Sequence, residues 1–361
     1  MKQTLYSMTE ILGVNRVSAA LHRNRPVILT FHGVTSETSD TICNDEGLHL
    51  HRPLFERLMG HVARHYNPVP LGRVVDWLEG KDGPLERAVC VTFDDGFRNV
   101  LTEAGPALKR YDIPATLFVT TDFVFKKQML WPDKLVSAIA LTNEARLDLE
   151  VQRTNRSYDL TTRDAKLRAN ANLNALCKSL SQAERLALLS GIIERLHVDE
   201  SQLASAWDGF RPIDPAEMRL LRGIGVTVGA HTCSHPILAR LSAAEQSTEL
   251  TASKQLIEKV IGEACDSFAY PNGGPGDFDD DTRARVIDAG YRCAFTTIKR
   301  RVSRVDDRFE IPRCTLTHNR VTVAEFAAEL SGFPGTLRAL LNRPGTDARS
   351  ASTPPQAALQ S

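Results

Sequence analysis

The sequence predicts an α/β fold with a mostly parallel central sheet and a helical insertion. Short apolar, partly β-branched runs alternate with stretches of helical spacing, which is typical of strands and helices that take turns along a chain. Between residues 123 and 212 the strand signal fades, and Leu, Ala, Arg, Asn and Glu recur at helical spacing instead. With 361 residues, 42% of them hydrophobic, the chain can bury one large core and carry such an insertion.

Before the insertion, helices separate short buried strands. An amphipathic helix is expected over residues 4–21, docked on the domain because little basic charge lines its polar face. The expected strands, each a short apolar run, are residues 26–31, 88–93 and 114–120. Helical spacing predicts helices over 53–66 and about 100–111, and 69–78 suggests a short strand followed by a helix.

The α/β pattern resumes after the insertion. A helix end is expected at 218–221, strands at 226–230, 267–270 and 293–297, and helices at 243–261 and 279–289. Residues 342–361 are rich in Pro, Ser, Thr, Ala and Gln, so this tail is expected to be disordered. The expected organisation is an N-terminal helix (1–25), a core domain (26–122 and 213–340), an insertion (123–212) and a tail (341–361).

Composition excludes several classes of protein. Lys+Arg and Asp+Glu both total 44, so the formal net charge is zero and nothing indicates binding to nucleic acid. Seven cysteines without a CxxC pair favour a reducing compartment over a disulfide framework. Residues 1–25 lack the features of a secretory signal, and no apolar run is long enough to span a bilayer. We therefore expect a cytoplasmic protein, with a peripheral membrane location as the alternative and no indication of its oligomeric state.

Two adjacent carboxylates follow the second of these strands, in the run Thr92-Phe-Asp-Asp-Gly96. Gly96 allows a sharp turn, and ligand sites of α/β folds lie at the carboxyl ends of their strands. Two neighbouring ionised acids repel each other, so the pair favours a cation or a proton. The alternative is an ordinary Asp-Gly turn with exposed acids.

Two histidines four residues apart follow another expected strand, in His231-Thr-Cys-Ser-His235. Imidazoles at this spacing can face one side of a turn and bind one metal ion, and the alternative is a pair of surface histidines. Together with one carboxylate of Asp94-Asp95, they leave open positions on a zinc-like ion for water and substrate. The other carboxylate is then free to act as a base on that water, although the spacing does not say which aspartate takes which role.

A third strand end, Ser267-Phe-Ala-Tyr-Pro-Asn-Gly-Gly274, runs into a turn that can present backbone N–H groups to a developing oxyanion. By itself it is also an ordinary turn. In this order the three runs, with Tyr111-Asp-Ile-Pro-Ala-Thr-Leu-Phe-Val119 before the third strand, resemble the NodB-homology polysaccharide deacetylases, carbohydrate esterase family 4. The resemblance covers about residues 26–122 and 213–320.

The resemblance implies a distorted, incomplete (β/α) barrel with one divalent metal ion in a cleft at the strand ends. By position it makes Asp94 the catalytic base and the backbone N–H of Asn272 a donor to the oxyanion. The implied metal ligands are Asp95, His231 and His235. Zinc is the expected ion, and cobalt, nickel, manganese or iron also suit two imidazoles and a carboxylate. The implied partner is an N-acetylated saccharide.

The general acid has two candidates. Leu316-Thr-His318 fits a Leu-x-His motif that many family members carry near the C-terminus. Leu29-Thr-Phe-His-Gly33 instead resembles the subgroup that deacetylates biofilm poly-N-acetylglucosamine, in which the equivalent histidine lies on the first strand. We favour His32 because it ends a well-defined strand, whereas His318 lies in a polar stretch.

The third motif departs from many family members, because Ala269 stands where they carry an arginine that orients the base. Arg313 is the candidate to supply that charge or to contact substrate, and the alternative is a structural or exposed arginine. Tyr270 and Pro271 are further candidates for substrate contact. Trp131, at the start of the insertion, either forms a sugar-stacking wall over the cleft or anchors the insertion to the core.

These patterns predict a metal-dependent hydrolase that removes N-acetyl groups from a poly- or oligosaccharide and releases acetate. Two alternatives keep the same site. One is an O-acetyl esterase or an amidase with a non-sugar substrate. The other is a catalytically inactive protein that binds metal or carbohydrate, which the missing third-motif arginine favours and the intact Asp94 argues against.

Overall fold

A computed structural model describes residues 14–36, 41–45, 47–315 and 321–333. The start of the expected N-terminal helix, the expected tail and the candidate acid His318 lie outside these residues. Helix α2 (Val14–Leu21) is the described part of the N-terminal helix. Within the described part of the chain, no helix is long and apolar enough to cross a lipid bilayer.

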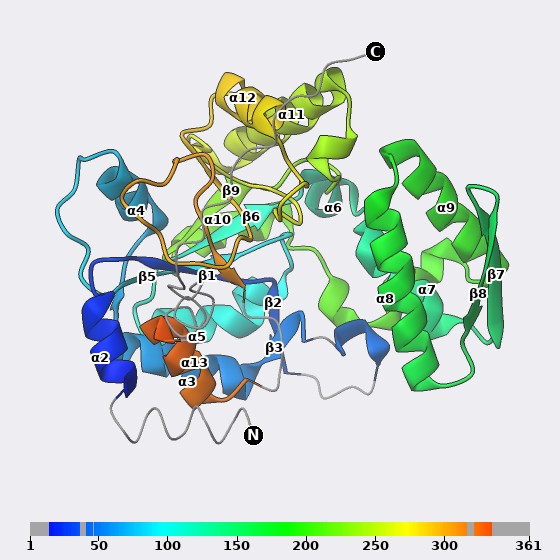
Figure 1. Ribbon diagram of the computed structural model, residues 1–361, viewed down its shortest axis with the longest axis horizontal. Coiled ribbons are helices and arrows are strands. Elements are labelled where there is room, and N and C mark those ends of the chain that lie inside the picture. The colour runs from blue at the N-terminus through cyan, green and yellow to red at the C-terminus, as the bar shows by residue number, and fades with distance from the viewer. Residues whose placement is uncertain (1–13, 37–40, 46, 316–320, 334–361) are drawn as a thin grey trace, which may run out of the picture.

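The core is a parallel sheet that curls into a half-barrel at the centre of the molecule (Figure 1). Its strands follow the order β11-β10-β9-β6-β5-β1-β12, and the short β4 pairs with the start of β5. Their bounds are β1 (Val27–Phe31), β4 (Asn67–Pro68), β5 (Ala88–Phe93), β6 (Ala115–Val119), β9 (Val226–Ala230), β10 (Ser267–Ala269), β11 (Cys293–Phe295) and β12 (Cys314–Thr315). This architecture confirms the predicted α/β fold and incomplete barrel.

One short segment, residues 308–315, joins the two edges of this sheet. Ile311 bridges to Phe295 of β11, and its N–H donates a hydrogen bond of 2.9 Å to the carbonyl oxygen of Ala294. Three residues later β12 pairs with β1, with Cys314 opposite Leu29. The open side of the half-barrel is therefore spanned by segment 308–315, which also carries Arg313.

Residues along the strands alternate between two apolar clusters, because successive side chains of a strand point to opposite faces. The larger cluster lies under the surrounding helices and includes Leu29 and Val91. The smaller one lines the inner side of the half-barrel and includes Ile28 and Cys90. With both faces buried, these strands read as continuous apolar runs in the sequence, which explains why they could be predicted.

Helices cover the outer side of the sheet (Figure 1). Capping explains where several of them begin: α11, for example, starts after a capping box formed by Ser242 and Glu245. The helices of the core are α3 (Arg52–His65), α4 (Leu71–Leu78), α5 (Gly105–Arg110), α6 (Thr121–Lys126), α10 (Pro215–Arg222), α11 (Ala243–Ile261), α12 (Asp280–Asp288) and α13 (Val323–Ser331). Helix α5 follows a π-helical turn, Val100–Ala104, so the helix predicted over 100–111 is present in two parts.

The insertion forms a lobe beside the half-barrel (Figure 1). Its helices are α7 (Trp131–Leu141), α8 (Arg163–Ser179) and α9 (Gln182–Arg195). It is not helical throughout, because β7 (Arg146–Val151) and β8 (Thr154–Asp159) form an antiparallel hairpin. The prediction of an all-helical insertion was wrong here. The sequence does contain a strand pattern, because Leu147, Leu149 and Val151 alternate with exposed polar residues.

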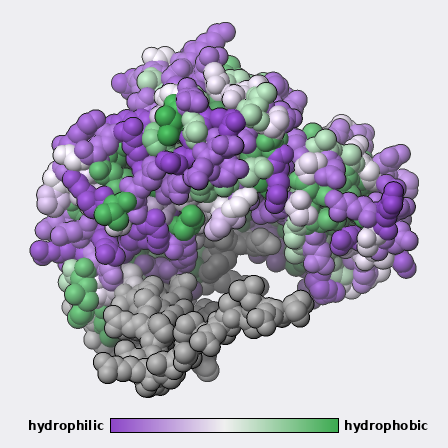
Figure 2. Space-filling model, turned by 45° about the horizontal axis from the view of Figure 1, so that its top comes forward, coloured by the Kyte–Doolittle hydropathy of each residue, from purple (hydrophilic) through white to green (hydrophobic). Residues whose placement is uncertain are grey.

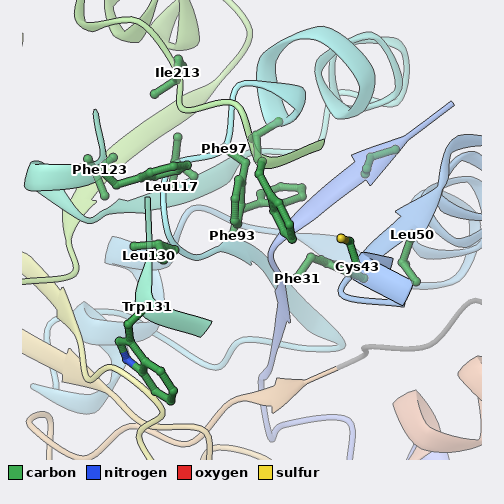
Figure 3. Close-up of a cluster of buried hydrophobic side chains, with 14 of the residues drawn as sticks. Phe31, Cys43, Leu50, Phe93, Phe97, Leu117, Phe123, Leu130, Trp131 and Ile213 are labelled. Atoms are coloured by element: carbon green, nitrogen blue, oxygen red, sulfur yellow. The ribbon is translucent and has the colours of Figure 1, made fainter. Parts of the chain in front are cut away.

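The insertion shares its core with the half-barrel. Leu130 and Trp131 lie in the same apolar cluster as Phe93 and Phe123 (Figure 3). On the face of the molecule shown in Figure 2, the surface is largely hydrophilic and its apolar residues form small groups. The insertion is therefore fixed to the domain by buried contacts, and it can contribute to a site at the ends of the strands.

Candidate active site and metal centre

Strands β1 and β5 pair side by side and lead into the first two site residues. Phe31 lies opposite Phe93 in the register, so His32 and Asp94 follow at neighbouring positions. On β5 the residues Cys90, Thr92 and Asp94 share one face, since every second residue does. The apolar inner face of the strand is therefore followed, at its carboxyl end, by the carboxylate of Asp94.

The turns after the strands hold several residues in a left-handed backbone conformation. The angle φ is 76° at Asp95, 58° at His235 and 58° at Asn272. This region is uncommon outside glycine and costs about 1–3 kcal/mol per residue, and such strain collects at functional sites. Gly96 follows Asp95 with φ of 102°, and a Cβ there would lie 2.9 Å from Val124 Cγ2. Each of the three motifs thus positions its functional residue through a strained turn.

The structure brings Asp95, His231 and His235 together. The Oδ1 atom of Asp95 lies 3.6 Å from Nε2 of His231 and 3.5 Å from Nε2 of His235. One ligand atom from each residue lies within 4.8 Å of the other two, and all three residues are buried. Two imidazole nitrogens and a carboxylate oxygen that converge in this way can hold one divalent cation.

Surrounding residues orient His231 and fix the loop that joins it to His235. Nδ1 of His231 lies 2.7 Å from the carbonyl oxygen of Ala269, so it carries the proton and Nε2 has a free lone pair. The carboxylate of Glu249, on α11, accepts hydrogen bonds from the backbone N–H groups of Cys233 and Ser234 and from the Ser234 hydroxyl. Glu249 therefore fixes the loop between the two histidines.

The electrostatics of this group fit a cation. Asp95 Oδ1 is buried and has no hydrogen-bond partner among the described residues. Burial, followed by the charges of Asp94 and Asp133, raises the pKa of Asp95 well above its ordinary value. Burial also lowers the pKa of His235 well below its ordinary value, which leaves its imidazole neutral. A cation would satisfy the orphaned oxygen and balance the clustered acids, so these residues fit a metal ion.

Asp94 is held by Arg313 in a bidentate ion pair. Nη1 and Nη2 of Arg313 each lie 2.7 Å from one carboxylate oxygen of Asp94, and both side chains are buried. Burial alone would raise the pKa of Asp94, but Arg313, His231 and His32 together outweigh it and lower the pKa to about 2. The guanidinium also donates to the carbonyl oxygen of Thr296. Asp94 is therefore ionised at neutral pH, and Arg313 supplies the charge that Ala269 lacks.

The two candidates for the general acid differ in what the structure says of them. His32 borders the same cavity as Asp94 and Asp95, and its buried Nδ1 has no hydrogen-bond partner among the described residues. Burial lowers the pKa of His32 to about 4, against the opposing effect of Asp94. His318 lies outside the described residues. His32 therefore lies at the site, with an unpaired ring nitrogen.

Asn272 also borders the cavity. Its carbonyl oxygen accepts a hydrogen bond from the hydroxyl of Thr297, which anchors the turn to the end of β11. Within the described part of the chain its backbone N–H has no hydrogen-bond acceptor, so that donor is available to a ligand.

The four residues predicted to contact substrate do not border this cavity. Tyr270 is 1% exposed, and its hydroxyl donates to the carbonyl oxygen of Phe309. Pro271 is buried, and Arg313 is fully buried beneath Asp94. Trp131 is 5% exposed and donates from Nε1 to the carbonyl oxygen of His235, so it anchors the insertion and does not form an open wall. Arg313 and Trp131 thus occupy the positions of their alternative roles, holding Asp94 and anchoring the insertion. Burial and pairing depend on packing, which local sequence does not show, and substrate contact by these four residues stays a prediction.

The cavity has a volume of about 460 Å³, and three parts of the chain line it: the half-barrel, residues 42–45 with Leu48, and the insertion. The half-barrel supplies the residues already described, and the insertion supplies Asp133 from α7 with Asn170 and Asn174 from α8. Sequence reasoning missed these three residues and Glu249. Asp133 lies two residues after Trp131, and the asparagines recur at helical spacing. No local pattern distinguishes Glu249 from other exposed-helix acids.

Comparisons with known proteins agree with this geometry. A family model described as polysaccharide deacetylase matches residues 81–294, more than half of the 361 residues. No curated protein sequence matches the chain.

Solved structures share the fold. Streptococcus pyogenes deacetylase PplD in complex with acetate is 17% identical with a TM-score of 0.56, and the match covers 85% of this chain and 98% of that one. IcaB from Ammonifex degensii is 18% identical with a TM-score of 0.54, covering 85% and 97%. A polysaccharide deacetylase from Bacillus cereus is 17% identical with a TM-score of 0.53, covering 85% and 69%.

Proposed function

This chain belongs to the polysaccharide deacetylase family of hydrolases, and from that premise we propose that it removes N-acetyl groups from a poly- or oligosaccharide in a metal-dependent reaction. The products would be acetate and a free amino sugar. The observation that carries the proposal is the convergence of Asp95 with His231 and His235 beside an ionised Asp94. These groups come from the ends of two separate strands, β5 and β9, and an ordinary surface would not bury them together.

Asp95, His231 and His235 would hold the cation, with zinc the first choice for this donor set and cobalt, nickel, manganese or iron as alternatives. When bound, such a cation supplies Lewis-acid polarisation of the acetamide carbonyl and makes water at the site more acidic. Three buried ligands with a hydrogen-bonded histidine favour a single defined position for it.

The chain's own residues supply the proton transfers. Asp94 accepts the proton of the attacking water, since Arg313 keeps its carboxylate ionised and aimed. The Asn272 N–H donates a hydrogen bond to the oxygen that becomes negative. As the C–N bond breaks, His32 protonates the leaving amine. Because burial keeps the resting imidazole neutral, His32 would acquire that proton during the catalytic cycle.

The Asp94–Arg313 pair favours an active enzyme over the inactive binding protein. The missing arginine of the third motif is the feature that favours an inactive protein. Arg313 supplies the same guanidinium from segment 308–315, with two hydrogen bonds of 2.7 Å to the base. A protein that only bound metal or carbohydrate would have no need for a buried ion pair at this position.

The test is acetate release combined with metal analysis. Purified protein is stripped with a chelator, reloaded with zinc, cobalt, nickel or manganese, and incubated with N-acetylglucosamine oligomers, O-acetylated glycans and a non-sugar acetamide. We expect acetate from the N-acetylated sugars only, with about one metal ion per chain. Release from O-acetyl glycans or the simple acetamide alone would favour the esterase or amidase, and bound metal without any acetate release would contradict the proposal.

A further inference from the structure

The insertion presents a polar face to the catalytic cavity. On α8, the residues that border the cavity are Leu167, Asn170, Asn174 and Lys178, which recur at helical spacing. A second stripe of the same helix, Ala165, Ala169, Leu173 and Cys177, is buried in the insertion. The apolar stripe thus fixes how α8 is rotated, and this rotation turns the two asparagines toward the site.

Several polar atoms on this face lack partners. Oδ1 of Asn170, Oδ1 of Asn174 and Oδ2 of Asp133 are buried and have no hydrogen-bond partner among the described residues. Asp133 is only 4% exposed. Buried polar atoms are nearly always paired, so three unpaired atoms around one cavity indicate a ligand or ordered water that completes them.

The three groups suit a neutral polyol. Each carboxamide offers an acceptor and two donors, which match sugar hydroxyl and acetamide groups. Burial raises the pKa of Asp133 to about 8, which favours a neutral carboxyl that can donate as well as accept. From Asn170 to Lys178 the helix rises about 12 Å, which exceeds a single sugar ring, and the face ends at the exposed Lys178.

We propose that Asp133, Asn170 and Asn174 form a subsite for a second sugar unit, so that the enzyme acts on chains of two or more sugars and discriminates against a single one. This inference rests on the proposed function of the same site. It assigns the insertion a role in substrate selection, which the half-barrel residues do not explain. The residues act by positioning the substrate and take no part in the proton transfers.

The experiment compares kcat/KM for N-acetylglucosamine and for its di- to pentamers. Wild-type protein should prefer the oligomers. The double variant Asn170→Ala/Asn174→Ala should lose roughly tenfold or more on oligomers, because hydrogen bonds to the second sugar are lost, and the loss on the monomer should be much smaller. Asn172→Ala is the matched control, since Asn172 lies exposed on the same helix and does not border the cavity.

Asp133 is tested by a pair of variants. Asp133→Asn keeps a donor and an acceptor and should retain oligomer activity, whereas Asp133→Leu should lose it to a similar extent as the asparagine variants. Loss in Asp133→Asn equal to that in Asp133→Leu would mean that an ionised carboxylate is needed, and it would overturn the role assigned to Asp133. Thermal melting of each variant checks that the fold is intact.

Other outcomes separate this inference from the proposed function. Equal losses on monomer and oligomer, no loss on the oligomers, or an Asn172→Ala variant as impaired as the double one would each overturn the subsite. If wild-type protein deacetylates no sugar, the proposed function fails, and calorimetry of oligomer binding decides the subsite instead. Binding that the double variant abolishes supports the subsite, and absent or unchanged binding overturns it.

Discussion

Asp94 has its orientation set by one neighbour, Arg313, which is also the first contributor to keeping it ionised. Arg313 grips both carboxylate oxygens at 2.7 Å in a fully buried pair. A bidentate guanidinium fixes direction as well as charge, which a lysine could not do. The base can therefore stay ionised in a setting where burial alone would protonate it.

The variant Asp94→Asn should lose most of its turnover and keep its bound metal. Removing a general base typically lowers kcat by about 10²–10⁴, and Asp94 is not among the three converging ligand atoms. Acetate release and metal content are measured on the same preparation, with Asp148→Asn on the exposed hairpin as the control. Normal kcat in Asp94→Asn would reject its role as the base.

Removing only the arginine should destabilise the protein. Arg313→Met leaves a buried carboxylate without its partner, which costs about 3–5 kcal/mol in the free energy of unfolding. Asp94→Leu/Arg313→Met removes both charges and should recover most of that stability while remaining inactive. Urea unfolding of both variants measures this, and a double variant as unstable as Arg313→Met would contradict the explanation.

Helix α3 contains a buried histidine, His61, whose protonation should change the free energy of unfolding. His61 packs against Phe326 of α13 with ring centroids 5.9 Å apart. Burial, followed by the charges of His65 and Arg64, lowers the pKa of His61 from 6.5 to about 4. The unfolded chain therefore takes up this proton at a higher pH than the folded protein, and stability present above pH 6.5 is lost as the pH falls toward 4.

We expect the free energy of unfolding of His61→Gln to fall less than that of the wild type as the pH is lowered from 6.5 to 4. The difference between the two proteins should grow by up to about 3 kcal/mol between pH 7 and pH 4. Urea titrations at several pH values measure it, and His197→Gln, at an exposed histidine, serves as the control. Parallel pH curves for wild type and His61→Gln would show that this imidazole is not responsible.

The loop between β9 and α11 depends on Glu249. Its carboxylate accepts three hydrogen bonds from the Cys233–Ser234 turn, at 2.7, 3.0 and 2.6 Å. Glu249→Gln replaces one accepting oxygen with an amide donor, so the histidines should be held less firmly. Metal affinity should fall by about 10–100-fold, as for other residues that orient ligands, with kcat largely restored at saturating metal.

The control for this variant is Glu263→Gln, which changes an exposed acid paired with Arg222. Competition with a chromogenic chelator gives the metal affinity of each protein. An affinity equal to that of the wild type would show that the turn holds its shape without the carboxylate.

For the whole molecule, the metal should act as a stabilising ligand. Three buried residues from distant parts of the chain converge only in the folded state, so a cation that binds them shifts the folding equilibrium. When the free metal concentration is a hundred times Kd, the free energy of unfolding rises by about 2.7 kcal/mol, which should raise Tm by several degrees. Calorimetry with and without chelator checks this, and His231→Ala/His235→Ala should show no such shift.

Most strands of the sheet and the main site residues could be predicted from local sequence, for physical reasons. Strands buried on both faces read as apolar runs, and the Asp94-Asp95 and His231–His235 pairs are close in sequence as well as in space. Sequence could name Arg313 as a candidate partner of the base but not choose between that role and its alternatives, because the pairing joins residues 219 positions apart and depends on the closed sheet. The role of Asn170 and Asn174 likewise depends on packing, because helical spacing shows that they share a face but not what the face meets.

Segment 308–315 completes the wall of the half-barrel and also contains Arg313, which keeps the base Asp94 ionised and oriented. Structural integrity and reactivity are consequently governed by the same few residues. A molecule whose wall loosens at this seam would lose the arginine that keeps Asp94 ionised before it lost its metal ligands, because those ligands follow the interior strands β5 and β9. Partial unfolding would thus yield an inert protein and not an indiscriminate amidase.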